Sequence, residues 1–170
     1  DPSYMNALGA PRIPDPTTAG DFTRRFTDEA SVLNLMEAIN LVRPEIWKSL
    51  PAKERRRAVL DVDGTLAPTT GECKEGMGLS YNGIWGYHPL LVSLANTREA
   101  LYLVNRPGNV VSHEGAVRYL DGAIDLVCDT FKEVWLRGDT DFALTEHFDR
   151  WSEDGVKFVF GIDAMKNLVD

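Results

Sequence analysis

Cysteine is scarce in this sequence, and negative charge outweighs positive charge. Cys73 and Cys128 are the two cysteines among 170 residues, and neither belongs to a CxxC or a Cys/His spacing. We therefore expect neither a zinc site nor a disulfide framework, and a reducing compartment fits the composition. The formal net charge is −8, which argues against a surface that binds nucleic acid over its whole extent.

Long apolar runs are missing as well, and we expect residues 1–16 not to be a secretory signal. No stretch approaches the roughly 18 apolar residues that cross a bilayer, and residues 1–16 lack the basic and then apolar order of a secretory signal. We expect no membrane association and a cytoplasmic location. The chain begins at Asp1 without a Met, which we interpret as a fragment or a processed form. Its hydrophobic content of 44% is typical of a packed domain.

The N-terminal part of the chain predicts helices. Residues 1–16 are rich in proline and should be extended or irregular. Thr17 or Thr18 is expected to cap a first helix. Apolar residues at a period of about 3.6 predict a second helix over residues 28–43. We take residues 1–52 as an N-terminal helical region.

From residue 53 onward the pattern predicts a domain of strands and helices. Two expected strands, 81–95 and 100–105, are joined by a short turn that forces antiparallel pairing. The complete order comprises a strand at 58–63, a loop at 67–78, the two strands above, a helix from Ser112 to about Asp129, a strand at 134–136, a helix after Asp139 and a strand at 156–162. We therefore predict an α/β fold for residues 53–170.

Two aspartates fall on one face of the first apolar strand. Alternate side chains of a strand share a face, so Asp61 and Asp63 point the same way with Cα atoms roughly 6.5–7 Å apart. Burying an unpaired carboxylate costs several kcal/mol or forces protonation. A divalent cation resolves this conflict. The alternative is that one of the two aspartates caps a turn or pairs with an arginine.

Asp139 marks the end of a second strand. By itself it reads as an ordinary helix cap, but ligands of α/β sheets gather at strand ends. If the two strands are neighbours, Asp63 and Asp139 are expected to hold a metal between them. Two metals about 3.5–4 Å apart support phosphodiester chemistry. We assign contacts with DNA phosphates to Arg106, Asn109, Arg137 and Lys74, with an ordinary solvated side chain as the alternative for each.

Residues 61–66, Asp-Val-Asp-Gly-Thr-Leu, resemble the DxDGT[LV] signature of haloacid-dehalogenase phosphohydrolases. That resemblance implies a nucleophile at Asp61 and a late acidic metal motif at residues 138–141. However, that fold alternates strand and helix from the first motif onward, whereas antiparallel strands are expected here. We keep it as the alternative function.

A wider resemblance, to DDE-type insertion-sequence transposases of DDE group 1, covers nearly the whole chain. The matching stretches are residues 13–22, 61–65, 70–76, 81–83, 86–90, 103–109, 136–139 and 155–161. The resemblance implies an RNase H-like mixed sheet, DNA transposition by strand cleavage and strand transfer, and a two-metal site for Mg²⁺ or Mn²⁺. It also implies transposon ends and target DNA as partners, a homodimer in the active complex and a place at the bacterial nucleoid.

The same resemblance assigns roles to the aspartates. It matches Asp63 to the first catalytic acid, with Asp61 as the fallback, and Asp139 to the second. Asp141 departs from the family pattern, which has glycine there. The family's third acid is a later Glu in a Tyr/Arg/Glu/Lys signature that nothing before Asp170 matches. We therefore expect a chain truncated before the third acid and a poor catalyst by itself.

Strand order separates these functions. An antiparallel meander with Asp63 beside Asp139 favours the transposase, and a parallel sheet throughout favours the phosphohydrolase. A third possibility is a remnant that binds DNA without cutting it, and such binding would depend steeply on salt.

Overall fold

The computed structural model describes residues 2–7, 9, 11–13, 15–71 and 74–163. The chain divides into two compact units, Asp1–Ile39 and Asn40–Asp170. Within the described residues no helix is both long and apolar enough to cross a membrane.

The first unit is helical. It holds α1 (Pro2–Ala7), α2 (Pro16–Thr23) and all but the last residue of α3 (Glu29–Asn40). The helix at Pro2–Ala7 corrects the expectation of an irregular segment. Proline at the first position of a helix is favourable because no partner exists there for its missing N–H. The cap of α2 is also corrected: the Asp15 side chain accepts from the Thr17 N–H at 2.8 Å, so the helix begins before either threonine.

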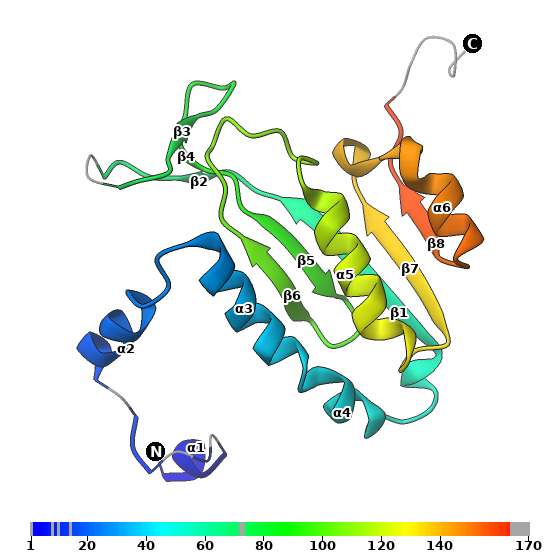
Figure 1. The fold of residues 1–170 in the computed structure, drawn as a ribbon, viewed down its shortest axis with the longest axis horizontal. Helices are drawn as coiled ribbons and strands as arrows, with labels where there is room; N and C mark the ends of the chain where they lie inside the picture. The colour runs from blue at the N-terminus through cyan, green and yellow to red at the C-terminus, as the bar shows by residue number, and fades with distance from the viewer. Residues whose placement is uncertain (1, 8, 10, 14, 72–73, 164–170) are drawn as a thin grey trace. The chain divides into compact units, whose positions relative to one another are not determined.

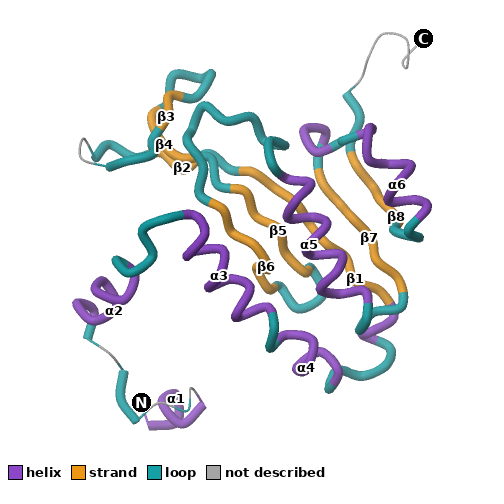
Figure 2. Tube along the Cα trace, in the orientation of Figure 1, coloured by secondary structure: helices purple, strands orange, loops and turns teal. Residues whose placement is uncertain are grey.

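A five-stranded mixed sheet forms the centre of the second unit (Figures 1 and 2). Its order is β6 (Glu99–Val104), β5 (Leu90–Leu94), β1 (Arg57–Gly64), β7 (Glu133–Gly138) and β8 (Lys157–Phe160). Strands β1, β5 and β6 form an antiparallel meander, and β7 and β8 run parallel to β1. This order confirms the RNase H-like fold class. It differs from the parallel sheet expected of the phosphohydrolase.

Helix α5 (Ala116–Cys128) covers one face of this sheet. Ala58, Leu60 and Val62 of β1 are buried on that face, together with Leu120 and Val127 of α5. The odd-numbered residues of β1 lie on the opposite face and are half-buried or exposed. The helix begins later than the expected cap at Ser112, because Gly115 precedes it with a φ of 71° that suits glycine.

Short helical segments connect β7 to β8. These are two 3-10 turns, Thr140–Phe142 and Thr145–His147, and α6 (Phe148–Glu153). The Phe148 ring of α6 stacks on Phe158 and Phe160 of β8, with centroid separations of 4.3 and 5.7 Å. This aromatic cluster packs α6 against β8, the strand that follows Asp139 in the chain.

A second, three-stranded sheet lies in the region that the sequence predicted as loop and continuous strand. Its order is β2 (Ala67–Pro68), β4 (Trp85–Tyr87) and β3 (Gly78–Leu79). The strand expected at 81–95 is broken, because a turn occupies its start. Gly83 adopts a φ of 75° there, and the Ser80 N–H donates to Ile84 O at 2.9 Å.

Close contact between glycines joins this small sheet to the Pro-Gly loop at residues 105–109. The Gly108 N–H donates to Gly86 O at 3.0 Å. A Cβ on Gly86 would lie 2.3 Å from Ala67 O, and one on Gly108 would lie 2.6 Å from Gly78 O. Side chains at these positions would therefore force the two segments apart.

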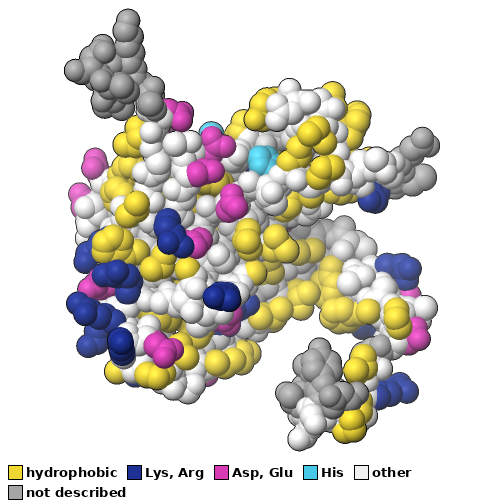
Figure 3. Space-filling view, turned by 180° about the vertical axis from the view of Figure 1, so that it is seen from behind, with side chains coloured by type: hydrophobic (Ala, Val, Ile, Leu, Met, Phe, Trp, Pro, Cys, Tyr) yellow, Lys and Arg dark blue, Asp and Glu magenta, His cyan; other side chains and the backbone are white. Residues whose placement is uncertain are grey.

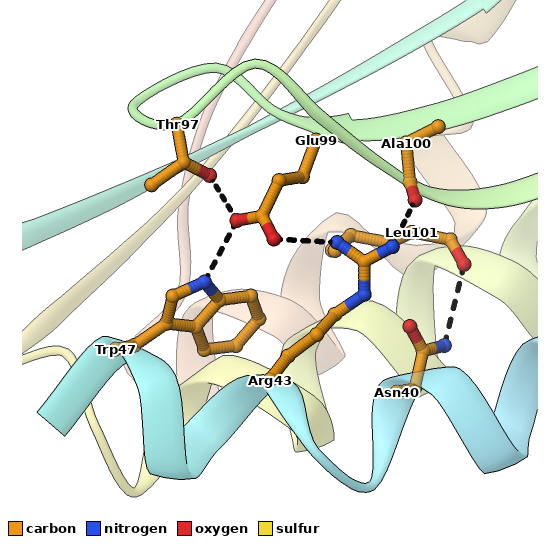
Figure 4. Close-up of polar contacts among 7 residues, drawn as sticks. All are labelled: Asn40, Arg43, Trp47, Thr97, Glu99, Ala100 and Leu101. Atoms are coloured by element: carbon orange, nitrogen blue, oxygen red, sulfur yellow. Dashed lines mark hydrogen bonds and ion pairs between the residues drawn. The ribbon is translucent and has the colours of Figure 1, made fainter. Parts of the chain in front are cut away.

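Helix α4 (Arg43–Lys48) anchors to the edge strand β6 through polar contacts (Figure 4). Arg43 donates to Glu99 Oε1 at 2.8 Å and to Ala100 O at 2.7 Å. The Trp47 indole donates to Glu99 Oε2 at 2.8 Å. Trp47 is 1% exposed, so the pair with Glu99 brings a large apolar side chain into the core of the second unit.

Candidate active site

Asp63 and Asp139 lie at the carboxyl ends of neighbouring parallel strands. The parallel register of β1 and β7 pairs Asp61 with Arg137, so Asp63 and Asp139 each follow this last pair by two residues. The strands remain in contact beyond that pair, because a Cβ on Gly138 would lie 2.9 Å from Val62 Cγ1. Neighbouring strands are about 4.8 Å apart. Asp139 keeps an extended backbone, so both aspartates fall on the face opposite α5.

Asp61 is already paired. Arg137 Nε and Nη2 donate to its two carboxylate oxygens, each at 2.7 Å. The hydrogen bond that Arg137 donates to Asp61, followed by the charge attraction between them, raises the pKa of Arg137. The fallback metal ligand and one predicted phosphate contact therefore neutralise each other, as the alternative of pairing with an arginine anticipated. The side chains are 31% and 58% exposed, so the pair contributes little to stability.

The other two carboxylates keep oxygen atoms available. Within the described part of the chain, no hydrogen bond or ion pair reaches the exposed Asp63 carboxylate. Asp139 caps the following 3-10 turn, since its Oδ1 accepts from the Asp141 N–H at 3.0 Å. This is the capping role that the sequence offered as an alternative, and it occupies one oxygen of Asp139. The Asp63–Asp139 pair thus offers the hard oxygen ligands that Mg²⁺ and Mn²⁺ take.

A third acidic ligand does not join the pair in the part of the chain that the structure describes, where no group of three or more His, Cys, Asp or Glu is placed to hold a metal. The two carboxylates fit a divalent cation but form an incomplete ligand set by themselves.

Arg106 has a structural environment rather than an open one. It is 9% exposed, and its guanidinium donates to the backbone carbonyls of His88 at 2.9 Å, Ser112 at 3.0 Å and Glu114 at 2.7 Å. Burial lowers its pKa. These bonds hold the loop that leads into α5, so the interior position differs from that of an exposed phosphate contact.

The two remaining residues predicted to contact DNA are exposed. Lys74 donates from Nζ to Thr69 Oγ1, and Asn109 lies in the Pro-Gly loop. Glu72 and Cys73, which belong to a stretch that carried the resemblance, lie outside the described residues. The structure therefore does not gather Lys74, Arg106, Asn109 and Arg137 into one basic cluster.

A hollow of about 470 Å³ includes the last residue of β1 and the turn after β7 in its lining, although neither Asp63 nor Asp139 lines it. We call it the strand-end hollow; its lining comprises Gly64, Leu66, residues 80–82, His88, residues 108–113 and Asp141. Gly64 follows Asp63, and Asp141 follows Asp139 by two positions. Asp141 Oδ2 accepts from Ser112 Oγ at 2.7 Å, which ties the loop before α5 to the end of β7. Sequence reasoning missed this feature because segments distant in the chain build it.

Charge is distributed unevenly over the open face of the main sheet. Acidic side chains lie near the carboxyl ends of β1 and β7, and Lys and Arg gather toward the opposite ends of these strands (Figure 3). Residues 53–57, at the start of β1, contain four basic side chains: Lys53, Arg55, Arg56 and Arg57.

The comparison with protein-family models agrees with the transposase resemblance. The model of the family described as "Transposase DDE domain group 1" matches residues 7–170. No curated protein matches the chain. Among solved structures, the chain is similar to the piggyBac transposase in a synaptic complex with hairpin DNA, with 18% sequence identity and a TM-score of 0.46. That match covers 86% of this chain and 33% of the other, so this chain spans about a third of that transposase.

Proposed function

Because this chain belongs to the family of transposase DDE domain group 1, we propose that it catalyses metal-dependent DNA cleavage and strand transfer. Asp63 and Asp139 are the proposed catalytic acids, and residues 53–170 the proposed catalytic core. The observation that supports the proposal is the parallel pairing of β1 and β7, in which Asp61 faces Arg137 two residues before Asp63 and Asp139. Transposon ends and target DNA are the proposed substrates.

The aspartate pair has the properties of a metal site that lacks one ligand. The Asp63 carboxylate is exposed, and Asp139 is oriented by the Asp141 N–H. When bound, Mg²⁺ or Mn²⁺ would supply charge for the phosphodiester transition state and acidify the attacking hydroxyl group. We propose that a further acid, which no described residue supplies beside this pair, completes the ligand set.

The proposed reaction has two transfers at phosphorus. A water oxygen attacks the phosphodiester at the element end, and the bond from phosphorus to the 3′ oxygen breaks to free a 3′-OH. That 3′-OH then attacks a phosphodiester of the target, whose own 3′ oxygen leaves. The protein contributes by orienting the carboxylates and aligning the attacking oxygen with the phosphodiester. Positioning and preorganised charge lower the barrier to phosphoryl transfer most.

Asp61 does not suit the alternative of a phosphohydrolase nucleophile. Both of its carboxylate oxygens accept from Arg137, and two antiparallel strands follow its own strand. Trapping an aspartyl-phosphate at Asp61 would restore that alternative.

The proposal is tested by neutralising each acid without changing its size. In a transposase that contains this chain, Asp63→Asn or Asp139→Asn is expected to lower Mg²⁺-dependent cleavage of a terminal DNA substrate by on the order of 10²–10³-fold or more. In the 170-residue chain, either change should weaken Mn²⁺ binding, measured by electron paramagnetic resonance, by roughly tenfold.

Asp154→Asn is the matched control, because Asp154 is an exposed acid at the end of α6. It should leave both cleavage and Mn²⁺ binding unchanged. Full cleavage by the Asp139 variant would refute the assignment. DNA binding with a steep salt dependence and no cleavage, even by the longer protein, would indicate a non-catalytic remnant.

A further inference from the structure

A second hollow of about 470 Å³ lies at the amino end of β1, the end of that strand opposite to Asp63. We call it the basic hollow; its lining comprises Lys53, Glu54, Arg56, Arg57, Val59 and Asn96. Resting on the proposed function, we propose that this hollow binds backbone phosphates of the DNA duplex that the active site cuts. It is then a second DNA contact, separate from the catalytic acids.

The charge of the basic hollow is opposite to that of the whole chain. Three of its side chains are cations and one is a carboxylate, whereas the chain has a formal net charge of −8. Lys and Arg side chains gather at this end of the open sheet face (Figure 3). A DNA phosphate placed there meets an excess of positive charge and releases its own counterions, which favours binding.

Two cations of the basic hollow are available to a ligand. Lys53 and Arg56 are exposed, and within the described residues no hydrogen bond or ion pair engages either side chain. Arg55, between them in the chain, is half-buried and donates from Nε to Leu50 O at 3.1 Å. Arg55 therefore fixes the 3-10 turn before β1, and its two neighbours remain free to contact phosphate.

Asn96 holds one wall of the basic hollow in place. Its Oδ1 accepts from the Val59 N–H, and its Nδ2 donates to Arg57 O, both at 2.9 Å. Because both ends of the side-chain amide bind β1, the turn between β5 and β6 is held against the start of that strand. The wall is therefore formed before a ligand arrives, which lowers the entropic cost of binding.

Arg57 is held by the neighbouring strand. Its guanidinium lies 4.6 Å from the centre of the Trp135 ring, and its Nε lies 3.5 Å from Glu133 Oε2. Lys157 Nζ lies 3.4 Å from the same carboxylate oxygen, so one carboxylate serves two cations. The excess of positive charge thus continues from the basic hollow across β7 to β8.

Distance separates the basic hollow from the phosphate that reacts. Asp63 follows Arg57 by six positions of β1, which corresponds to about 20 Å at roughly 3.3 Å per residue. A duplex rises about 3.4 Å per base pair, so it reaches the hollow roughly six base pairs from the cut. Contacts with the backbone carry no sequence information, so the hollow is expected to bind duplexes regardless of their sequence.

The test removes the two unpaired cations in the double variant Lys53→Gln/Arg56→Gln. Binding of a duplex of arbitrary sequence to the 170-residue chain is measured by fluorescence anisotropy over a series of salt concentrations. The slope of log affinity against log salt concentration is expected to become shallower by about 1.8, because each lost phosphate contact removes about 0.9. At the lowest salt concentration the variant should bind roughly tenfold more weakly.

Arg24→Gln/Lys48→Gln is the matched control, because it removes the same residue types from exposed positions outside the hollow. Each of these cations pairs with an acid three positions earlier in the chain. The control should keep the salt slope. An equal change in both double variants would overturn the location, and an unchanged slope in Lys53→Gln/Arg56→Gln would overturn the inference.

A polyglutamate peptide distinguishes DNA from an acidic protein partner. The duplex is expected to bind more tightly than the peptide, because it carries about one negative charge per 1.7 Å of its axis. Tighter binding of the peptide, lost in the Lys53→Gln/Arg56→Gln variant, would overturn the assignment to DNA and indicate a protein partner.

A transposase that contains this chain shows whether one duplex meets both sites. Lys53→Gln/Arg56→Gln is expected to raise the DNA concentration for half-maximal cleavage roughly tenfold and to leave cleavage at saturating DNA unchanged. An unchanged half-maximal concentration would overturn the link to the duplex that is cut. Full cleavage by the Asp139→Asn variant refutes the proposed function, whereas the salt slope judges the basic hollow independently.

Discussion

At the scale of single residues, the open face of the main sheet is organised around Trp135. The Arg57 guanidinium lies 4.6 Å and the Lys157 ammonium 5.3 Å from the centre of its ring. The indole N–H donates to Glu133 Oε2 at 3.2 Å. This hydrogen bond, with smaller contributions from Lys157 and Arg57, lowers the pKa of Glu133. One aromatic side chain thus lowers the pKa of a neighbouring carboxyl group.

Replacing Trp135 with Phe is expected to raise the pKa of Glu133 toward its ordinary value of 4.5, because the ring remains but the donor is lost. Since the folded-state pKa is depressed, Glu133 contributes stability above its unfolded pKa, and that contribution disappears as the pH falls through the folded-state pKa. Titration of the side-chain carboxyl carbons by NMR measures the shift.

Asp15 is the internal control for this titration, because bonds from Thr17 rather than Trp135 lower its pKa. Its midpoint should not move. An unchanged midpoint for Glu133 would show that Trp135 is not the cause.

At the scale of elements, three glycines determine how the small sheet meets the Pro-Gly loop. Gly78, Gly86 and Gly108 approach so closely that each would place a Cβ within 3 Å of neighbouring backbone. Because the loop continues toward α5, the same contact fixes the wall of the strand-end hollow.

Gly86→Ala is expected to destabilise the protein by about 1–3 kcal/mol, the usual cost of overpacking. Its Cβ would meet the rigid Ala67 carbonyl at 2.3 Å. Gly71→Ala is the control, since its Cβ would meet only the flexible Lys74 side chain. Urea unfolding of both variants measures the difference, and equal midpoints would contradict the close packing.

Elements with a strong apolar periodicity were predictable from sequence. Elements that depend on contacts between segments distant in the chain were not. The apolar runs of β1, β7 and β8 and the stripe of α5 indicated their types and order. The two-residue strands β2 and β3 carry no periodic signal, and glycine contacts between distant segments hold them.

The same limit applies to the aspartates. Alternation placed Asp61 and Asp63 on one face, but it could not tell which of them faces Arg137. That choice depends on the register between β1 and β7, which pairs residues 76 positions apart. The strand-end hollow was still harder to predict from sequence, because its lining comes from separate segments between Gly64 and Asp141.

At the scale of the whole molecule, the second unit begins before its sheet does. Asn40 and α4 belong to it, and Trp47 packs edge-on against Phe131 with 5.7 Å between ring centres. The bonds of Arg43 and Trp47 to Glu99 join this helix to β6. Helix α4 is therefore part of the folded core rather than a connection to it.

A chain that starts at Asn40 is expected to keep the unfolding free energy of the second unit. A chain that starts at Ser49 should lose on the order of 3–5 kcal/mol, the cost of removing a buried tryptophan. Denaturant unfolding followed by far-UV circular dichroism measures both. Equal stability of the two shortened chains would show that α4 is dispensable.

The contacts on β6 have a further consequence for solubility. Asn40 donates to Leu101 O at 3.2 Å and Arg43 to Ala100 O at 2.7 Å, so side chains occupy carbonyls that an edge strand would otherwise offer to another chain. The opposite edge, β8, spans four residues and bears Lys157. Short, charged or covered edges discourage fibril-like growth. Self-association of this protein is therefore expected to use surfaces other than the edge strands β6 and β8 of its main sheet.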